Sequence, residues 1–74
     1  MLKRVSMKET ERILRDGGKV EKNARGQLLV WEKRTRETHP QYFIGCKPSY
    51  TEYYCVMGYI TPICYKKVLD IIGA

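Results

Sequence analysis

The stretch Gln27-Leu28-Leu29-Val30-Trp31-Glu32-Lys33 has the composition of a β-strand, since bulky aliphatic and aromatic residues are enriched in strands. Side chains alternate between the two faces of a strand, so Leu28 and Val30 share one face. Leu29 and Trp31 share the other, and both faces are therefore apolar. A sheet with one face open to water usually carries polar residues there. We therefore expect the second face to be covered, either by a binding partner or by a second copy of the chain.

The residues before this strand predict a helix. Ser6 followed by Glu9 is a capping-box pattern, in which each side chain satisfies a backbone N–H at the start of a helix. The helix should run from about Met7 to Asp16 and end at Gly17 and Gly18, because glycine accepts the left-handed conformation that closes a helix. One stripe of the helix is predicted to be buried: Met7, Thr10, Ile13 and Leu14.

Three further strands are predicted around the central one. Residues 19–22 should pair with it through a type I turn and a glycine bulge at 23–26. The polar stretch 34–40 is predicted to be a loop, 41–46 a strand, and 47–50 a turn. In the last strand, 53–60, Gly58 marks a bulge or a close approach of another segment. Alternation in this strand places Tyr53, Cys55, Met57 and Tyr59 on one face, and Tyr54, Val56 and Ile60 on the other.

A second helix is predicted after this strand. Thr61 is a good helix cap, and Pro62 at the first helical position loses no hydrogen bond. Gly73 ends the helix, and its apolar arc comprises Cys64, Tyr65, Val68, Leu69, Ile71 and Ile72. The sequence therefore predicts one α+β domain over residues 1–74. It has an N-terminal helix, an antiparallel sheet of three or four strands, and a C-terminal helix.

With three strands, the order α-β-β-β-α resembles that of double-stranded RNA-binding domains. The resemblance concerns topology alone, because the last helix carries Tyr65, Val68 and Leu69 where that family has an alanine-rich packing face. It therefore implies no site residues in this chain.

Positive charge is concentrated in the first half of the chain. The formal net charge is +6, and residues 1–36 contain eleven Lys or Arg against five Asp or Glu, whereas residues 37–74 contain three of each. Clustered cations gain free energy from phosphates through counterion release. Ion pairs along the first helix, or simple solubility, would explain the same charges without a ligand. The predicted phosphate contacts are Lys8, Arg12, Arg15, Arg25, Lys33, Arg34 and Arg36.

Aromatic residues form the second group of candidate contacts. All six tyrosines lie in the second half of the chain. Aromatic side chains on an open strand face stack on bases or anchor a protein partner, although tyrosine is also an ordinary strand residue. Trp31, Tyr53 and Tyr59 are the predicted partner-binding set.

The cysteines and the histidine predict neither a disulfide framework nor a metal site. The chain has three cysteines, Cys46, Cys55 and Cys64. An odd number cannot all pair within one chain, which favours a reducing compartment. Together with His39 they lack the short ligand spacing of zinc sites, so no metal and no cofactor are expected. Cys55 and Cys64 are predicted to be core residues, and Cys46 is the one that could act as a redox-active or dimer-forming thiol. A catalytic pair of Cys46 with His39 would require the fold to bring them together.

The sequence therefore predicts a small, basic, non-enzymatic nucleic-acid-binding module. We expect it to be soluble and cytoplasmic, because no apolar run approaches the ~18 residues of a membrane span and no secretory signal is present. The alternative is a protein-binding inhibitor or adaptor, of the size and charge found among phage and mobile-element products. It would dock on a larger partner that is acidic or processes nucleic acid, and a homodimer is compatible with either function.

Overall fold

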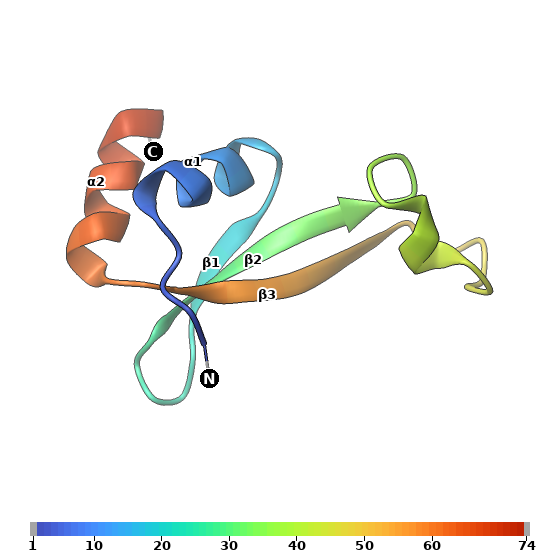
Figure 1. Cartoon of the computed structure of the whole chain (residues 1–74), viewed down its shortest axis with the longest axis horizontal. Coiled ribbons are helices and arrows are strands. Elements are labelled where there is room, and N and C mark those ends of the chain that lie inside the picture. The colour runs from blue at the N-terminus through green and yellow to red at the C-terminus, as the bar shows by residue number, and fades with distance from the viewer. Residues whose placement is uncertain (1, 74) are drawn as a thin grey trace.

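Two helices and a three-stranded antiparallel sheet make up the part of the chain described by the computed structural model, residues 2–73 (Figure 1). This confirms the predicted α+β class with three strands rather than four. The strand order in the sheet is β1-β2-β3, so β2 is central. The elements are α1 (Met7–Arg15), β1 (Lys19–Lys22), β2 (Leu28–Thr35), the short 3-10 helix η1 (Pro40–Phe43), β3 (Glu52–Ile60) and α2 (Pro62–Ile72).

Both α-helices begin where side-chain caps are available. The Ser6 hydroxyl accepts a hydrogen bond from the Glu9 N–H at 3.1 Å. Thr61 caps α2 in the same way, with Pro62 at its first position, and Gly73 closes it with φ 79°. The predicted helix boundaries are therefore confirmed to within one residue.

The core lies between the helices and one face of the sheet. Its buried apolar side chains come from the N-terminal segment, both helices and the sheet: Val5, Ile13, Val30, Ile60 and Val68. Thr10 and Ile13 on α1 are buried as the periodicity predicts, whereas Ile71 on α2 is 54% exposed, and its predicted burial is wrong. Neither helix within residues 2–73 is long and apolar enough to cross a bilayer.

The β2–β3 hairpin extends beyond the helices as an arm (Figure 1). The predicted strand 41–46 is wrong, because Pro40 starts a 3-10 turn there instead. Phe43 at the end of this turn is buried and packs on Tyr53, with ring centroids 4.9 Å apart. The predicted loop also starts too early, because β2 continues to Thr35 and pairs with β3 down to Glu52. The segment between the strands therefore folds into a small apolar cluster at the end of the arm.

A β-bulge in β3 reverses the alternation predicted for that strand. Val30 lies opposite Gly58 and Trp31 opposite Val56, so Met57 is an extra residue on β3. Tyr59 lies opposite Leu29, on the face of Trp31. The predicted grouping of Tyr53, Cys55, Met57 and Tyr59 on one face is therefore wrong. Before the bulge, Cys55 and Tyr53 pair with Glu32 and Arg34, on the face that the helices cover.

Gly58 is the point at which the N-terminal segment crosses β3. The Tyr59 N–H donates to the Lys3 carbonyl at 3.0 Å, and the Val5 N–H donates to the Tyr59 carbonyl at 2.8 Å. A side chain at position 58 would overlap the Lys3 carbonyl oxygen and crowd Val5. Gly58 also has φ 154°, so the predicted bulge and close approach are both confirmed.

We expect Gly58→Ala to lower the free energy of unfolding by about 1–3 kcal/mol from the backbone conformation, and further through displacement of the N-terminal segment. Gly45→Ala is the matched control, because Gly45 also has a positive φ, of 80°, but no atom within 4 Å of an added Cβ. Urea unfolding would measure both. Equal losses would show that the contact between residue 58 and Lys3 contributes nothing.

Candidate functional site

The basic side chains of α1 are largely neutralised by neighbouring carboxylates. The Arg15 Nε lies 3.0 Å from a Glu11 carboxylate oxygen. Arg12 contacts Glu9 and also lies 3.4 Å from Asp16. The hydrogen bond that Arg12 donates lowers the pKa of Glu9, and the same bond raises the pKa of Arg12. The alternative of intrahelical ion pairs therefore describes Arg12 and Arg15, which carry little unbalanced charge for a phosphate.

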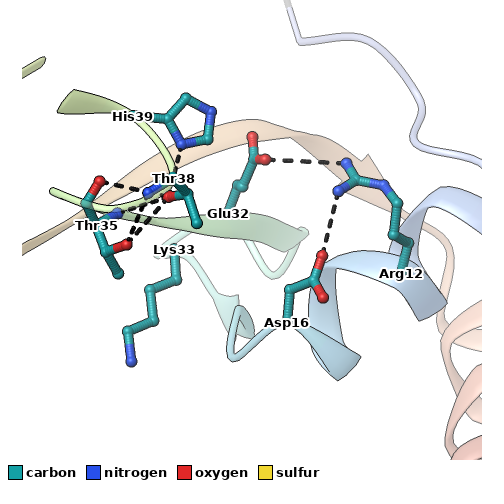
Figure 2. Close-up of a pocket in the computed structure, with 7 residues that line it drawn as sticks. All are labelled: Arg12, Asp16, Glu32, Lys33, Thr35, Thr38 and His39. Atoms are coloured by element: carbon teal, nitrogen blue, oxygen red, sulfur yellow. Dashed lines mark hydrogen bonds and ion pairs between the residues drawn. The ribbon is translucent and has the colours of Figure 1, made fainter. Parts of the chain in front are cut away.

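A cleft of about 400 Å³ between α1 and the end of β2 gathers several of these groups (Figure 2). Arg12 reaches across it toward Glu32, at 3.9 Å. On the opposite side the Thr38 hydroxyl contacts the His39 Nδ1 at 2.9 Å and accepts a hydrogen bond from the Thr35 N–H at 3.0 Å. The cleft therefore contains equal numbers of positive and negative side chains. The polar groups of the turn on its other side are hydrogen-bonded to one another.

Lys33 and Arg34 are neighbours in sequence but lie on opposite faces of the sheet. The Lys33 ammonium lies 3.2 Å from Glu52, on the face of the sheet opposite the helices. The Arg34 guanidinium lies 3.5 Å from Glu32 and over the Tyr42 ring, 4.6 Å from its centroid. Its side chain is only 16% exposed. These two cations therefore cannot act on one ligand as the predicted cluster.

Arg36 has a structural role at the end of the arm. Its guanidinium donates to the carbonyls of Tyr50 at 2.9 Å and Lys47 at 2.8 Å. It also lies over the Phe43 ring, 5.1 Å from the centroid. These contacts hold the segment between β2 and β3 against the arm, so the Arg36 guanidinium stabilises the fold and is not free to bind a phosphate.

Three of the predicted contacts have no acidic partner within residues 2–73: Arg36, which is held by backbone carbonyls, Lys8 and Arg25. Lys8 lies on α1, whereas Arg25 lies in the β1–β2 turn, beside a shallow pocket that Leu2 and Tyr59 also line. The seven predicted cations therefore do not converge into one patch. Sequence reasoning could not find this, because charge pairing depends on which faces the sheet register brings together.

The face of the sheet opposite the helices is uncovered and aromatic. Trp31 is at its centre on β2, with Val56 directly opposite on β3. Tyr54 and Tyr59 lie opposite Lys33 and Leu29, the residues two positions either side of Trp31. We call this surface the open face. It consists of Lys19 and Glu21 on β1, Leu29, Trp31, Lys33 and Thr35 on β2, and Glu52, Tyr54, Val56 and Tyr59 on β3.

Lys19 links the aromatic side chains of the open face. Its ammonium lies 4.5 Å from the Tyr54 ring centroid and 5.9 Å from that of Trp31. The Trp31 Nε1 is covered and has no hydrogen-bond acceptor within the described chain. Tyr54 and Val56 remain 36% and 40% exposed. The open face thus presents aromatic and aliphatic groups to solvent beside a cation.

Of the predicted aromatic set, Trp31 and Tyr59 share the open face, whereas Tyr53 does not lie beside them. Tyr53 lies on the opposite face, in the cluster at the end of the arm, where its hydroxyl is 2.9 Å from the Cys46 Sγ. That hydrogen bond, together with burial, raises the pKa of Tyr53. The bulge puts Tyr54 on the open face instead. Lys19 was also missed, although its pairing with Trp31 follows from the predicted hairpin.

The remaining sulfur and imidazole groups are dispersed. The three cysteines are free, and each is partly buried. Cys46 and His39 lie at the end of the arm, each in contact with a neighbouring hydroxyl. Within residues 2–73, no group of three His, Cys, Asp or Glu side chains could hold a metal ion.

We expect Arg36→Ala to lower the free energy of unfolding by about 1–2 kcal/mol, because it removes hydrogen bonds donated by a charged group. Proteolysis within residues 44–51 should become faster. Arg25→Ala is the control at an exposed turn and should change stability by less than about 0.5 kcal/mol. Chemical denaturation and limited proteolysis measure these effects, and identical behaviour of the two variants would contradict a structural role for Arg36.

Comparison with known proteins gives this chain no relative. No protein-family model matches it, and neither does any curated protein or solved structure. Its function has to be inferred from the geometry of its own side chains.

Proposed function

We propose that the chain binds single-stranded nucleic acid on its open face. The observation that carries this proposal is the row of Tyr54, which is exposed, and of Trp31 and Tyr59, which are partly exposed, with Lys19 over two of the rings. Exposed aromatic rings on a sheet stack on unpaired bases, and each stacked base contributes about 1–3 kcal/mol. The chain acts by binding, without catalysis, and its three free cysteines favour the cytoplasm.

The spacing of the rings favours a single strand over a duplex. Tyr54 and Tyr59 are the diagonal cross-strand neighbours of Trp31, for which the sheet sets a separation of about 7–8 Å. Bases within a duplex are stacked on one another about 3.4 Å apart along each strand, so their faces are closed to these rings. An unpaired strand can spread its bases to reach them.

Cations at the margin of the open face are suited to contact the phosphates. Arg4 pairs with Tyr59 in an isolated parallel β-bridge, so the two side chains lie on the same face of the sheet. Lys19 and Lys33 are paired with Glu21 and Glu52, which are themselves 57% and 44% exposed. Such surface pairs contribute about 0–1 kcal/mol, so a phosphate can replace the carboxylate at small cost. The net charge of +6 adds a general attraction for a polyanion.

A protein partner is the second candidate, because Leu29 and Val56 add aliphatic surface to the aromatic row. In that function the chain would be an inhibitor or adaptor, and the open face would be its anchor. Salt separates the two possibilities. Contact with three or four phosphates of a single strand gives a slope of about −2 to −3 for log K against log salt, whereas an aromatic protein interface responds weakly.

Trp31 is the single tryptophan of the chain, so its fluorescence reports directly on the open face. We expect a single-stranded oligonucleotide to quench it at low salt and a duplex of the same sequence to bind at least tenfold more weakly. Tyr54→Ala should weaken single-strand binding roughly 5- to 150-fold through lost stacking. Tyr50→Ala, an exposed tyrosine outside the open face, should not. Equal effects of the two variants, or no quenching, would contradict the proposal.

A further inference from the structure

The outer edge of β3 is a strand edge without a neighbour over most of its length. β2 occupies one side of β3, and within the described chain the other side is met by the N-terminal segment at Tyr59. The stretch 52–57 therefore has a free edge. Figure 1 shows this part of β3 running along the arm, away from both helices.

The register identifies which backbone groups face outward. Tyr59 directs its N–H and C=O to the N-terminal segment, and hence away from its cross-strand partner Leu29. Trp31 and Lys33 follow Leu29 at steps of two, so their partners Val56 and Tyr54 also direct their N–H and C=O outward. The next step reaches Thr35, so its partner Glu52 also faces outward at the end of the strand. Within the uncharged part of the edge, Tyr54 and Val56 together offer four hydrogen-bonding groups that have no partner in the described chain.

This edge lacks the features that usually prevent strands from pairing. Residues 53–57, Tyr-Tyr-Cys-Val-Met, contain no charge and no proline. Tyr54, Val56 and Met57 are exposed by 36%, 40% and 38%. The bulge at Met57 is the one protective device along it, and it lies at one end of the stretch.

We propose that the occupant of this edge is a second copy of the chain, paired antiparallel about a twofold axis at Cys55. In this register Tyr54 of one copy meets Val56 of the other in both directions, so the four outward groups of Tyr54 and Val56 in each copy are satisfied. Glu52, which pairs with Lys33 but remains 44% exposed, lies at one end of the stretch, and the basic Lys3-Arg4 segment lies beside Gly58 and Tyr59 at the other. Antiparallel pairing brings the acidic end of each copy toward the basic end of its partner. A parallel arrangement would bring like charges together.

The proposed dimer has two structural consequences. The sheets join into one of six strands, with the two open faces side by side on the same surface. Cys55 meets its symmetry mate as a non-hydrogen-bonded pair, for which the Cα atoms lie about 4.5 Å apart. That separation is within the range of about 4.4–6.8 Å that a disulfide spans. The dimer does not depend on the proposed nucleic-acid function.

Val56→Pro is the sharpest variant, because it removes an N–H that bonds to nothing within the described monomer and to Tyr54 of the partner in the dimer. We expect Val56→Pro to keep the circular dichroism spectrum of the wild-type chain and to weaken dimerisation roughly ten- to a hundredfold, as measured by analytical ultracentrifugation. A wild-type chain that remains monomeric at about 1 mM would overturn the proposal.

A cross-linking experiment tests the register even if the proline variant does not fold. The variant C46S/C64S retains Cys55, and an added oxidant such as oxidised glutathione should convert it to a covalent dimer. The matched control C46S/C55S retains Cys64, which is also partly buried, and should remain monomeric on a non-reducing gel. Equal cross-linking of the two variants, or none in either, would rule out the twofold axis at Cys55.

Discussion

The antiparallel pairing of β2 with β3, reset by one extra residue at Met57, determines where the functional side chains of this chain lie. On the helix side of the bulge, Val30 and Ile60 close the core. Gly58 gives the N-terminal segment room to cross β3 next to them. Beyond the bulge the same pairing continues as an arm, with Tyr54 and Val56 on the open face. A strand without the extra residue would exchange these faces, since a slip of one position turns every side chain over.

The charge of the chain is strongly positive in sum, but four of the seven predicted phosphate contacts are compensated locally. Arg12, Arg15, Lys33 and Arg34 each lie within 4 Å of a carboxylate oxygen. A role for α1 as a phosphate-tracking helix is therefore poorly supported. The surface best suited to bind a ligand is the open face of the sheet, where no helix of the described chain covers the aromatic rings. This shifts the nucleic-acid hypothesis from phosphates held by clustered basic residues to a single strand held by stacking.

Much of the fold follows from local sequence signals. Ser6, Thr61 and Gly73 mark helix ends, which depend only on residues nearby in sequence. The two apolar faces of β2 predicted one face in the core and a second apolar face on the other side of the sheet. The segment 41–46 could not be predicted locally, because Phe43 packs on Tyr53, which is ten residues away in sequence. The candidate site was half predicted. Trp31 and Tyr59 follow from strand composition, but the exchange of Tyr53 for Tyr54 depends on a bulge that Gly58 hints at without fixing its position.

The most direct test of the open face is a nuclear magnetic resonance titration of the labelled chain with a short single-stranded oligonucleotide at low salt. We expect the largest shifts at the Trp31 indole and at the amides of Leu29 and Tyr54, with α1 nearly unchanged. Shifts concentrated on Lys8 and Arg12, or no shifts at all, would contradict it.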